Sequence, residues 1–94
     1  MASVYILYSL SADKYYIGST KDLDQRILFH QEKEFARSFT AKYSDWELFH
    51  EISDVSNKTA RQIEMHIKRM KSRKYYESLK RFPEISERLI QLYR

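Results

Sequence analysis

The chain of 94 residues contains a single glycine, Gly18, which lies in the stretch YYIGST at residues 15–20. Proteins use glycine where the backbone must turn tightly or pass close to another group, and a domain of this size ordinarily contains several. Here the one glycine follows an aromatic-rich strand pattern and precedes a helix pattern. We therefore expect Gly18 to end a strand at a point where a side chain would obstruct a close approach.

Three segments have the composition of β-strands. Val4–Ser9 is rich in β-branched and aromatic residues and is apolar on both faces, which is typical of a central strand. Leu10–Lys14 is polar and predicts a turn, so Tyr15–Ser19 is expected to pair with the first strand as an antiparallel hairpin. Trp46–Ile52 alternates apolar and polar residues, which predicts a half-buried strand.

Apolar residues at helical spacing predict four helices. The predicted helices span residues 22–33, 58–71, 75–81 and 84–93, with a loop at 34–45. The residues expected to form the buried stripe of the second helix are Ala60, Ile63, Ile67 and Met70. Pro83 suits the first turn of the last helix, where its missing N–H has no cost. The residues expected to face the core from this helix are Ile85, Leu89 and Leu92.

The predicted order of elements is β-β-α-β-α-α-α. This order indicates an α/β (α+β) fold in which helices flank a small three-stranded antiparallel sheet. The chain is short enough to form one domain over residues 1–94. Its motif-bearing core is expected at about 4–79, followed by a C-terminal helix at about 83–93.

The composition limits the chemistry that the protein can perform and the cellular compartment in which we expect it. Hydrophobic residues make up 43% of the chain, which is typical of a globular domain. No apolar run reaches the length of a membrane span, so no membrane partner is expected. The absence of cysteine excludes disulfides, thiolate metal sites and cysteine nucleophiles. It also fits a reducing compartment, and we expect a cytoplasmic protein.

Positive charge is concentrated in one part of the chain. Residues 58–81 contain nine Lys or Arg and two Glu, a net charge of +7, whereas the whole chain carries +4. The remainder is therefore net −3. A basic block beside an acidic remainder indicates a polyanionic partner, and a solvated helix face is the alternative explanation.

Three polar residues lie on or beside predicted apolar helix faces. At about 100° per residue, His30 falls within the stripe that starts at Leu23, and Arg26 falls on its edge. Glu64 falls at the border of the face that carries Ile63. Each has a structural explanation: a hydrogen-bonded core histidine, an arginine whose stem covers the core edge, and a glutamate paired with a lysine one turn later.

These features, in this order and spacing, resemble the GIY-YIG nuclease family from Val4 to about Leu79. The segments that carry the resemblance are VYILYS, YYIGSTKDLDQRILFH, WELFHEI and ARQIEMHIKRMKSRKY. Residues 16–18 are the YIG half of the motif, and Tyr5 stands where the tyrosine of the GIY half stands.

Three further positions match the family. Arg26 follows Tyr16 by ten residues, as the family's helix arginine does. His30 matches a position where members carry His or Tyr, and Glu64 matches the family's single metal-binding glutamate. The resemblance therefore implies that Tyr5, Tyr16, Arg26, His30 and Glu64 are the catalytic residues.

The sequence also departs from the family at several positions. Ser3 and Val4 replace the glycine and isoleucine of the GIY half. Ser19 follows the YIG, where relatives often carry lysine or serine. Tyr76 stands twelve residues after the glutamate, where some members carry asparagine.

The resemblance implies metal-dependent hydrolysis of a DNA phosphodiester. Glu64 would hold one Mg²⁺ or Mn²⁺, and Arg26 would offer a planar fork of donors to the scissile phosphate. Tyr5 or Tyr16 would take the proton from water, or His30 would accept it from a tyrosine or act as the base itself. The residue types leave these routes open.

The resemblance implies that the basic block lies beside the active site and contacts DNA. The residues expected to contact DNA are Gly18, Lys68, Lys71, Arg73 and Lys74, the four cations by holding phosphates. The predicted function is a metal-dependent DNA endonuclease, guided in DNA processing or repair by DNA structure or by a protein partner. The alternative is a catalytically weak or inactive nucleic-acid-binding module on the same scaffold.

Overall fold

The computed structural model describes residues 1–23 and 45–94. Within these ranges the elements are β1 (Ala2–Ser9), β2 (Lys14–Thr20), β3 (Trp46–Val55), α2 (Asn57–Met70), α3 (Arg73–Arg81) and α4 (Pro83–Tyr93). The predicted α+β class with a three-stranded antiparallel sheet is confirmed. The predicted first helix lies outside the described residues beyond its start, so the described order is β-β-β-α-α-α.

The sheet has the strand order β2-β1-β3, and both pairs are antiparallel. The central position predicted for Val4–Ser9 is therefore confirmed. β1 and β2 form a hairpin whose turn contains Asp13 at a φ of 52°. The Tyr8 hydroxyl donates a 2.7 Å hydrogen bond to the carboxylate of Asp13, which fixes the tip of the hairpin.

A bulge in β3 changes the face to which its side chains point. Ile6 of β1 pairs with His50 and Leu7 pairs with Leu48, so Phe49 has no partner in the ladder. Strict alternation predicts that Trp46 and Ile52 share a face, but the extra residue places them in two different apolar clusters. The predicted regular strand is therefore wrong in its middle, where Leu48 is 40% exposed.

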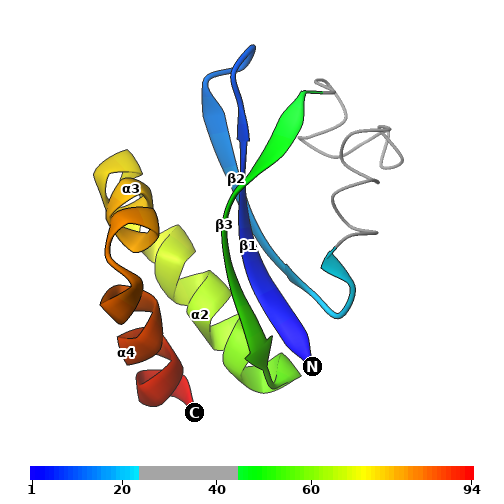
Figure 1. The fold of residues 1–94 in the computed structure, drawn as a ribbon, viewed down its shortest axis with the longest axis vertical. Coiled ribbons are helices and arrows are strands. Elements are labelled where there is room, and N and C mark those ends of the chain that lie inside the picture. Colours follow the sequence, from blue (N-terminus) through cyan, green and yellow to red (C-terminus); the bar gives the residue numbers. More distant parts are fainter. Residues whose placement is uncertain (24–44) are drawn as a thin grey trace.

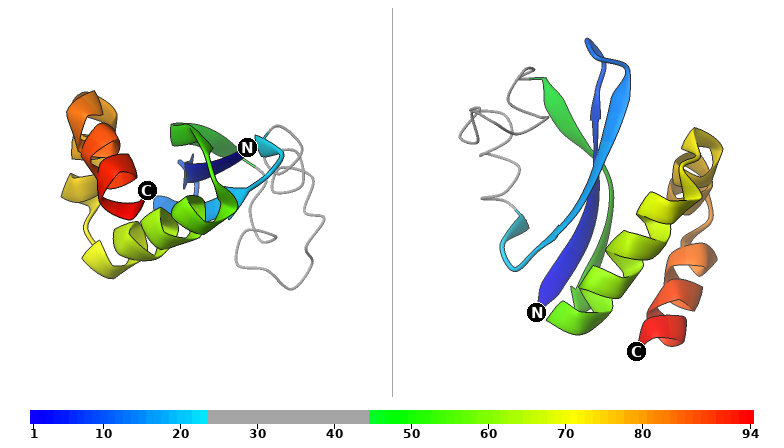
Figure 2. Two further views of the ribbon diagram at one scale, coloured as in Figure 1. Left: turned by 90° about the horizontal axis from the view of Figure 1, so that it is seen from below. Right: turned by 180° about the vertical axis from the view of Figure 1, so that it is seen from behind.

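The three helices cover one face of the sheet (Figures 1 and 2). α2 packs diagonally across β1 and β2, and α4 packs against α2 and α3. Ile63, Ile67 and Leu79 are fully buried in the cluster between the helices and the sheet. Both chain ends lie at the same end of the molecule in Figure 1.

Serine residues begin two of these helices. The Ser56 hydroxyl accepts a 3.1 Å hydrogen bond from the Thr59 amide, and the Ser72 hydroxyl accepts a 3.2 Å bond from the Tyr75 amide. Each hydroxyl satisfies a backbone donor that has no partner within the helix. The cap at Ser72 starts α3 two residues earlier than predicted.

Two residues predicted to be buried are exposed. Met70 is 45% exposed because α2 ends there, with Lys71 in the left-handed conformation at a φ of 47°. Leu92 is 64% exposed because the contact face of α4 runs through Leu89 and Tyr93 instead. None of the helices in the described ranges is long and apolar enough to cross a membrane.

Candidate active site

Gly18 lies directly opposite Tyr5 in the β1–β2 pair. A Cβ atom built on Gly18 would lie 2.6 Å from Cζ of the Tyr5 ring, and closer still to its hydroxyl oxygen. Gly18 does not have a positive φ, so other residues could adopt its backbone conformation. The need for glycine is therefore a need for space, and the ring of Tyr5, which is only 2% exposed, fills that space.

Tyr5 and Tyr16 form a stacked pair. Their ring centroids are 6.4 Å apart and their planes meet at 26°. Tyr16 also lies edge-on to Trp46, at a centroid distance of 6.4 Å. Together with Leu7 these residues form a second apolar cluster. It lies on the sheet face away from α2, because successive side chains of a strand point to opposite faces.

Tyr15 points to the other face and packs against the main apolar cluster. Its ring lies edge-on to Phe49 at 5.2 Å and tilted against Tyr76 at 5.1 Å. Burial raises the pKa of Tyr15 above its usual value. Tyr76, which replaces the asparagine of some family members, is 8% exposed and packs in this core.

Glu64 lies on α2 against the strand that carries the YIG residues. Its side chain is 20% exposed, and both carboxylate oxygens accept hydrogen bonds. Ser19 Oγ donates to Oε1 at 2.5 Å, and Lys68 Nζ donates to Oε2 at 2.7 Å. The pair with Lys68 is the structural explanation considered from the sequence. The bond from Ser19, across 45 residues of chain, was not expected.

Tyr5, from the tyrosine pair, and Glu64 thus contact consecutive residues of β2. Gly18 accommodates Tyr5, and Ser19 binds Glu64. The side chains approach from different sides, since Tyr5 and Tyr16 lie on the face away from α2 while Glu64 lies on the helix side. β2 is an edge strand of the described sheet, so Tyr16 and the Ser19–Glu64 contact lie at the sheet's edge, whereas Tyr5 lies on the central strand β1.

Arg26 and His30 lie outside the described residues, and their predicted roles stay predictions. Leu23 is the last described residue before them. It packs against the cluster of Tyr5, Leu7 and Trp46, on the tyrosine side of the sheet.

The four basic residues predicted to contact DNA have different surroundings. Arg73 donates a 2.8 Å bond to the Asp13 carboxylate and a second bond to the Asp13 backbone oxygen, which ties α3 to the hairpin tip. These hydrogen bonds raise the pKa of Arg73, and the bonds from Tyr8 and Arg73 lower that of Asp13. Lys68 is paired with Glu64. Lys71 and Lys74 are exposed and form no ion pair with any described residue.

A polar anchor at the start of β3 was not predicted from the sequence. The Asp45 carboxylate accepts bonds from Ser9 Oγ at 2.6 Å and from the Ser11 amide at 2.9 Å. These donors lower the pKa of Asp45 to about 2. Ser9 is fully buried, so the bond also satisfies a polar group inside the molecule. No local pattern links residues that are 36 positions apart.

The donor chemistry around Glu64 fits a hard divalent cation. A carboxylate beside a serine hydroxyl offers oxygen ligands of the kind that Mg²⁺ and Mn²⁺ take. Lys68, which covers Oε2, is 51% exposed and can move into water at low cost. Within residues 1–23 and 45–94 no group of three His, Cys, Asp or Glu side chains gathers to hold a metal.

The described residues form an α+β domain with two stacked tyrosines on its sheet and a glutamate on the helix α2 that packs against the sheet. A family model described as the GIY-YIG catalytic domain matches residues 1–77 of the 94-residue chain. The chain therefore belongs to the GIY-YIG family, a nuclease family, as the resemblance predicted. Searches of curated proteins and of solved structures each gave no significant match.

Proposed function

We propose that this protein is a divalent-metal-dependent endonuclease that hydrolyses DNA phosphodiester bonds. The observation that carries the proposal is the attachment of Glu64 to Ser19, beside the YIG glycine that accommodates Tyr5. A carboxylate that is only 20% exposed and is bound by the residue after the YIG glycine, on the sheet face opposite the tyrosine pair, supports a built site rather than a solvated helix face.

Each proposed role follows from the chemistry of the side chain. Glu64 would hold one Mg²⁺ or Mn²⁺, with Ser19 fixing the orientation of the carboxylate. Arg26 would bind the scissile phosphate through its planar guanidinium. A bound cation of this kind polarises a phosphoryl oxygen and neutralises the charge that develops on it.

The proton of the attacking water would pass to one of three groups. Tyr5 and Tyr16 are stacked, and a phenol needs a neighbouring cation or acceptor to act as a base near neutral pH because its pKa is ordinarily about 10. His30 is the third group, as an acceptor from a tyrosine or as the base. Packing around Tyr5, which is 2% exposed, would keep its ring in one orientation.

We also propose how the protein binds its DNA substrate and how it is brought to it. Lys71 and Lys74 are exposed cations that support binding of DNA phosphates. We propose that recognition follows DNA structure, or a protein partner that brings the domain to DNA during processing or repair, in a cytoplasmic setting. The alternative function is a nucleic-acid-binding module without turnover, and it is favoured by the pair between Lys68 and Glu64, which occupies a carboxylate oxygen.

The test is a cleavage assay on supercoiled, flapped and branched DNA with and without Mg²⁺ or Mn²⁺. Glu64→Ala is compared with Glu77→Ala, which removes an equal charge from an exposed position on α3. We expect metal-dependent cleavage by the wild-type protein and by Glu77→Ala, and none by Glu64→Ala. Salt-sensitive DNA binding without cleavage of any substrate would instead support the binding module.

A further inference from the structure

A surface hollow of about 320 Å³ opens between the end of β2 and the start of α2. Ser19 and Lys21 line it from the strand side, and Asn57 and Arg61 line it from α2. Ala2 and Ala60 are 3% and 1% exposed and leave the space open because their side chains are small. The hollow is separate from the apolar cluster that contains the tyrosine pair.

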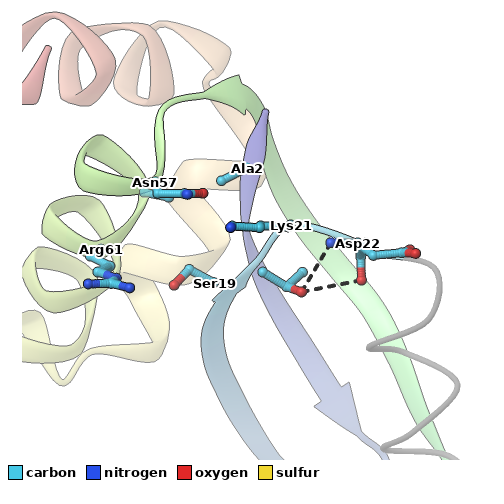
Figure 3. Close-up of a pocket in the computed structure, with 8 residues that line it drawn as sticks. Ala2, Ser19, Lys21, Asp22, Asn57 and Arg61 are labelled. Carbon is cyan, nitrogen blue, oxygen red and sulfur yellow. Dashed lines mark hydrogen bonds between the residues drawn. The ribbon is translucent and has the colours of Figure 1, made fainter.

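Three charged residues line this hollow, the cations Lys21 and Arg61 and the anion Asp22. Figure 3 shows the side chains of Lys21 and Arg61 directed into the space from opposite sides, while the side chain of Asp22 points away from it. Neither Lys21 nor Arg61 forms an ion pair with a described residue. Two cations that converge without a carboxylate between them favour an anion.

The loop that carries Lys21 is held in place. The Thr20 hydroxyl accepts a 3.2 Å bond from the Asp22 amide and donates a 3.3 Å bond to the Asp22 carbonyl oxygen (Figure 3). Arg61 extends from the second turn of α2, whose first turn is capped by Ser56. Both cations therefore extend from backbone that is fixed near the hollow, which lowers the entropic cost of binding an anion there.

The hollow is next to the proposed metal ligand. Ser19 lines the hollow and also donates its hydroxyl to Glu64. Arg61 precedes Glu64 by three positions on α2, and residues at this spacing are neighbours on a helix surface. An anion between Lys21 and Arg61 would thus lie beside the Glu64 carboxylate.

We propose that this hollow binds a backbone phosphate of the DNA strand, beside the phosphate that is cleaved at Glu64. The proposal rests on the proposed function, because that function identifies the bound phosphate as part of a DNA strand. It adds Lys21 and Arg61 to the residues that bind DNA. By contrast, Arg73 is paired with Asp13 and Lys68 is paired with Glu64. Arg61 can present two parallel donors to the phosphate, and Lys21 acts as a point charge.

The experiment measures equilibrium binding of a short DNA duplex in EDTA at several salt concentrations. Neutralising one phosphate changes the slope of log affinity against log salt by about 1. We expect Lys21→Gln/Arg61→Gln to reduce the magnitude of the slope by about 1, with circular dichroism as a check on folding. Arg61→Lys should keep the slope while weakening binding, because the charge stays and the fork is lost.

The matched control is Arg88→Gln/Arg94→Gln, which removes two charges from exposed positions in the middle of α4 and just after its end. Its slope should equal that of the wild-type protein. An unchanged slope in Lys21→Gln/Arg61→Gln, an equal reduction in the control, or no binding by the wild-type protein would each overturn the proposal.

The outcome is distinguishable from failure of the proposed function. Binding in EDTA requires no turnover, so a protein that never cleaves DNA can still give the expected change in slope. Conversely, a protein that cleaves DNA with metal but shows an unchanged slope retains its function and loses only the phosphate site.

Discussion

Replacement of Gly18 by alanine tests why the only glycine of the chain is where it is. The added Cβ would lie 2.6 Å from Tyr5 Cζ, whereas carbon atoms in favourable contact are about 3.5–4.0 Å apart. The buried Tyr5 ring would therefore have to shift by about 1 Å. Overpacking of this kind costs about 1–3 kcal/mol, and we expect Gly18→Ala to lower the free energy of unfolding by that amount.

A double-mutant cycle with Tyr5→Leu isolates the clash. Leucine has no atoms at the position of Cζ or the hydroxyl, and alanine is otherwise favoured over glycine within a strand by about 0.5–1 kcal/mol. We expect Gly18→Ala to stabilise the Tyr5→Leu protein by about 0.5–1 kcal/mol, which gives a coupling of about 1.5–4 kcal/mol between the two sites. Urea unfolding followed by circular dichroism measures all four proteins. An equal cost of Gly18→Ala in both backgrounds would refute the steric explanation.

Two further predictions concern charged groups. The pKa of Asp45 is lowered to about 2, so its carboxylate stabilises the folded state above the ordinary pKa of about 3.9 and loses this effect as the pH falls towards 2. Asp45→Asn should therefore destabilise the protein at pH 7, and urea unfolding should show this difference shrinking at low pH. Lys68→Met removes the cation from Glu64 and should tighten Mn²⁺ binding to the free protein about two- to fivefold in calorimetry; unchanged or weaker binding would contradict competition at that carboxylate.

Much of the fold was predictable because its signals are local. The apolar run Val4–Ser9 predicted the central strand, and the polar turn after it predicted the hairpin. The bulge at Phe49 was not predictable, since alternation in a single strand does not reveal an extra residue in the pairing with its neighbour. Met70 and Leu92 were wrongly predicted to be buried. Helical periodicity identifies the apolar face of a helix but not how far along that face the packing extends.

The candidate site was predictable only through residues at characteristic spacing. Strand alternation puts Ser19 on the same face as Ile17, towards the helices, but no pattern in the sequence pairs it with Glu64, which is 45 residues away. The bonds of Arg73 to Asp13 and of Asp45 to Ser9 join residues far apart in the chain. Such pairs depend on tertiary packing, and they explain why a basic block read from the sequence overstates the number of cations available to DNA.

The most direct test of the proposed function is the single-turnover rate of DNA cleavage by Glu64→Gln during a Mn²⁺ titration. Glutamine keeps the size of the side chain and removes the charge that would hold the ion. A metal contributes several kcal/mol to such a reaction, so we expect a loss of at least about a hundredfold at every Mn²⁺ concentration, while folding and DNA binding are retained. A rate equal to that of the wild-type protein would contradict the assignment of Glu64 as the metal ligand.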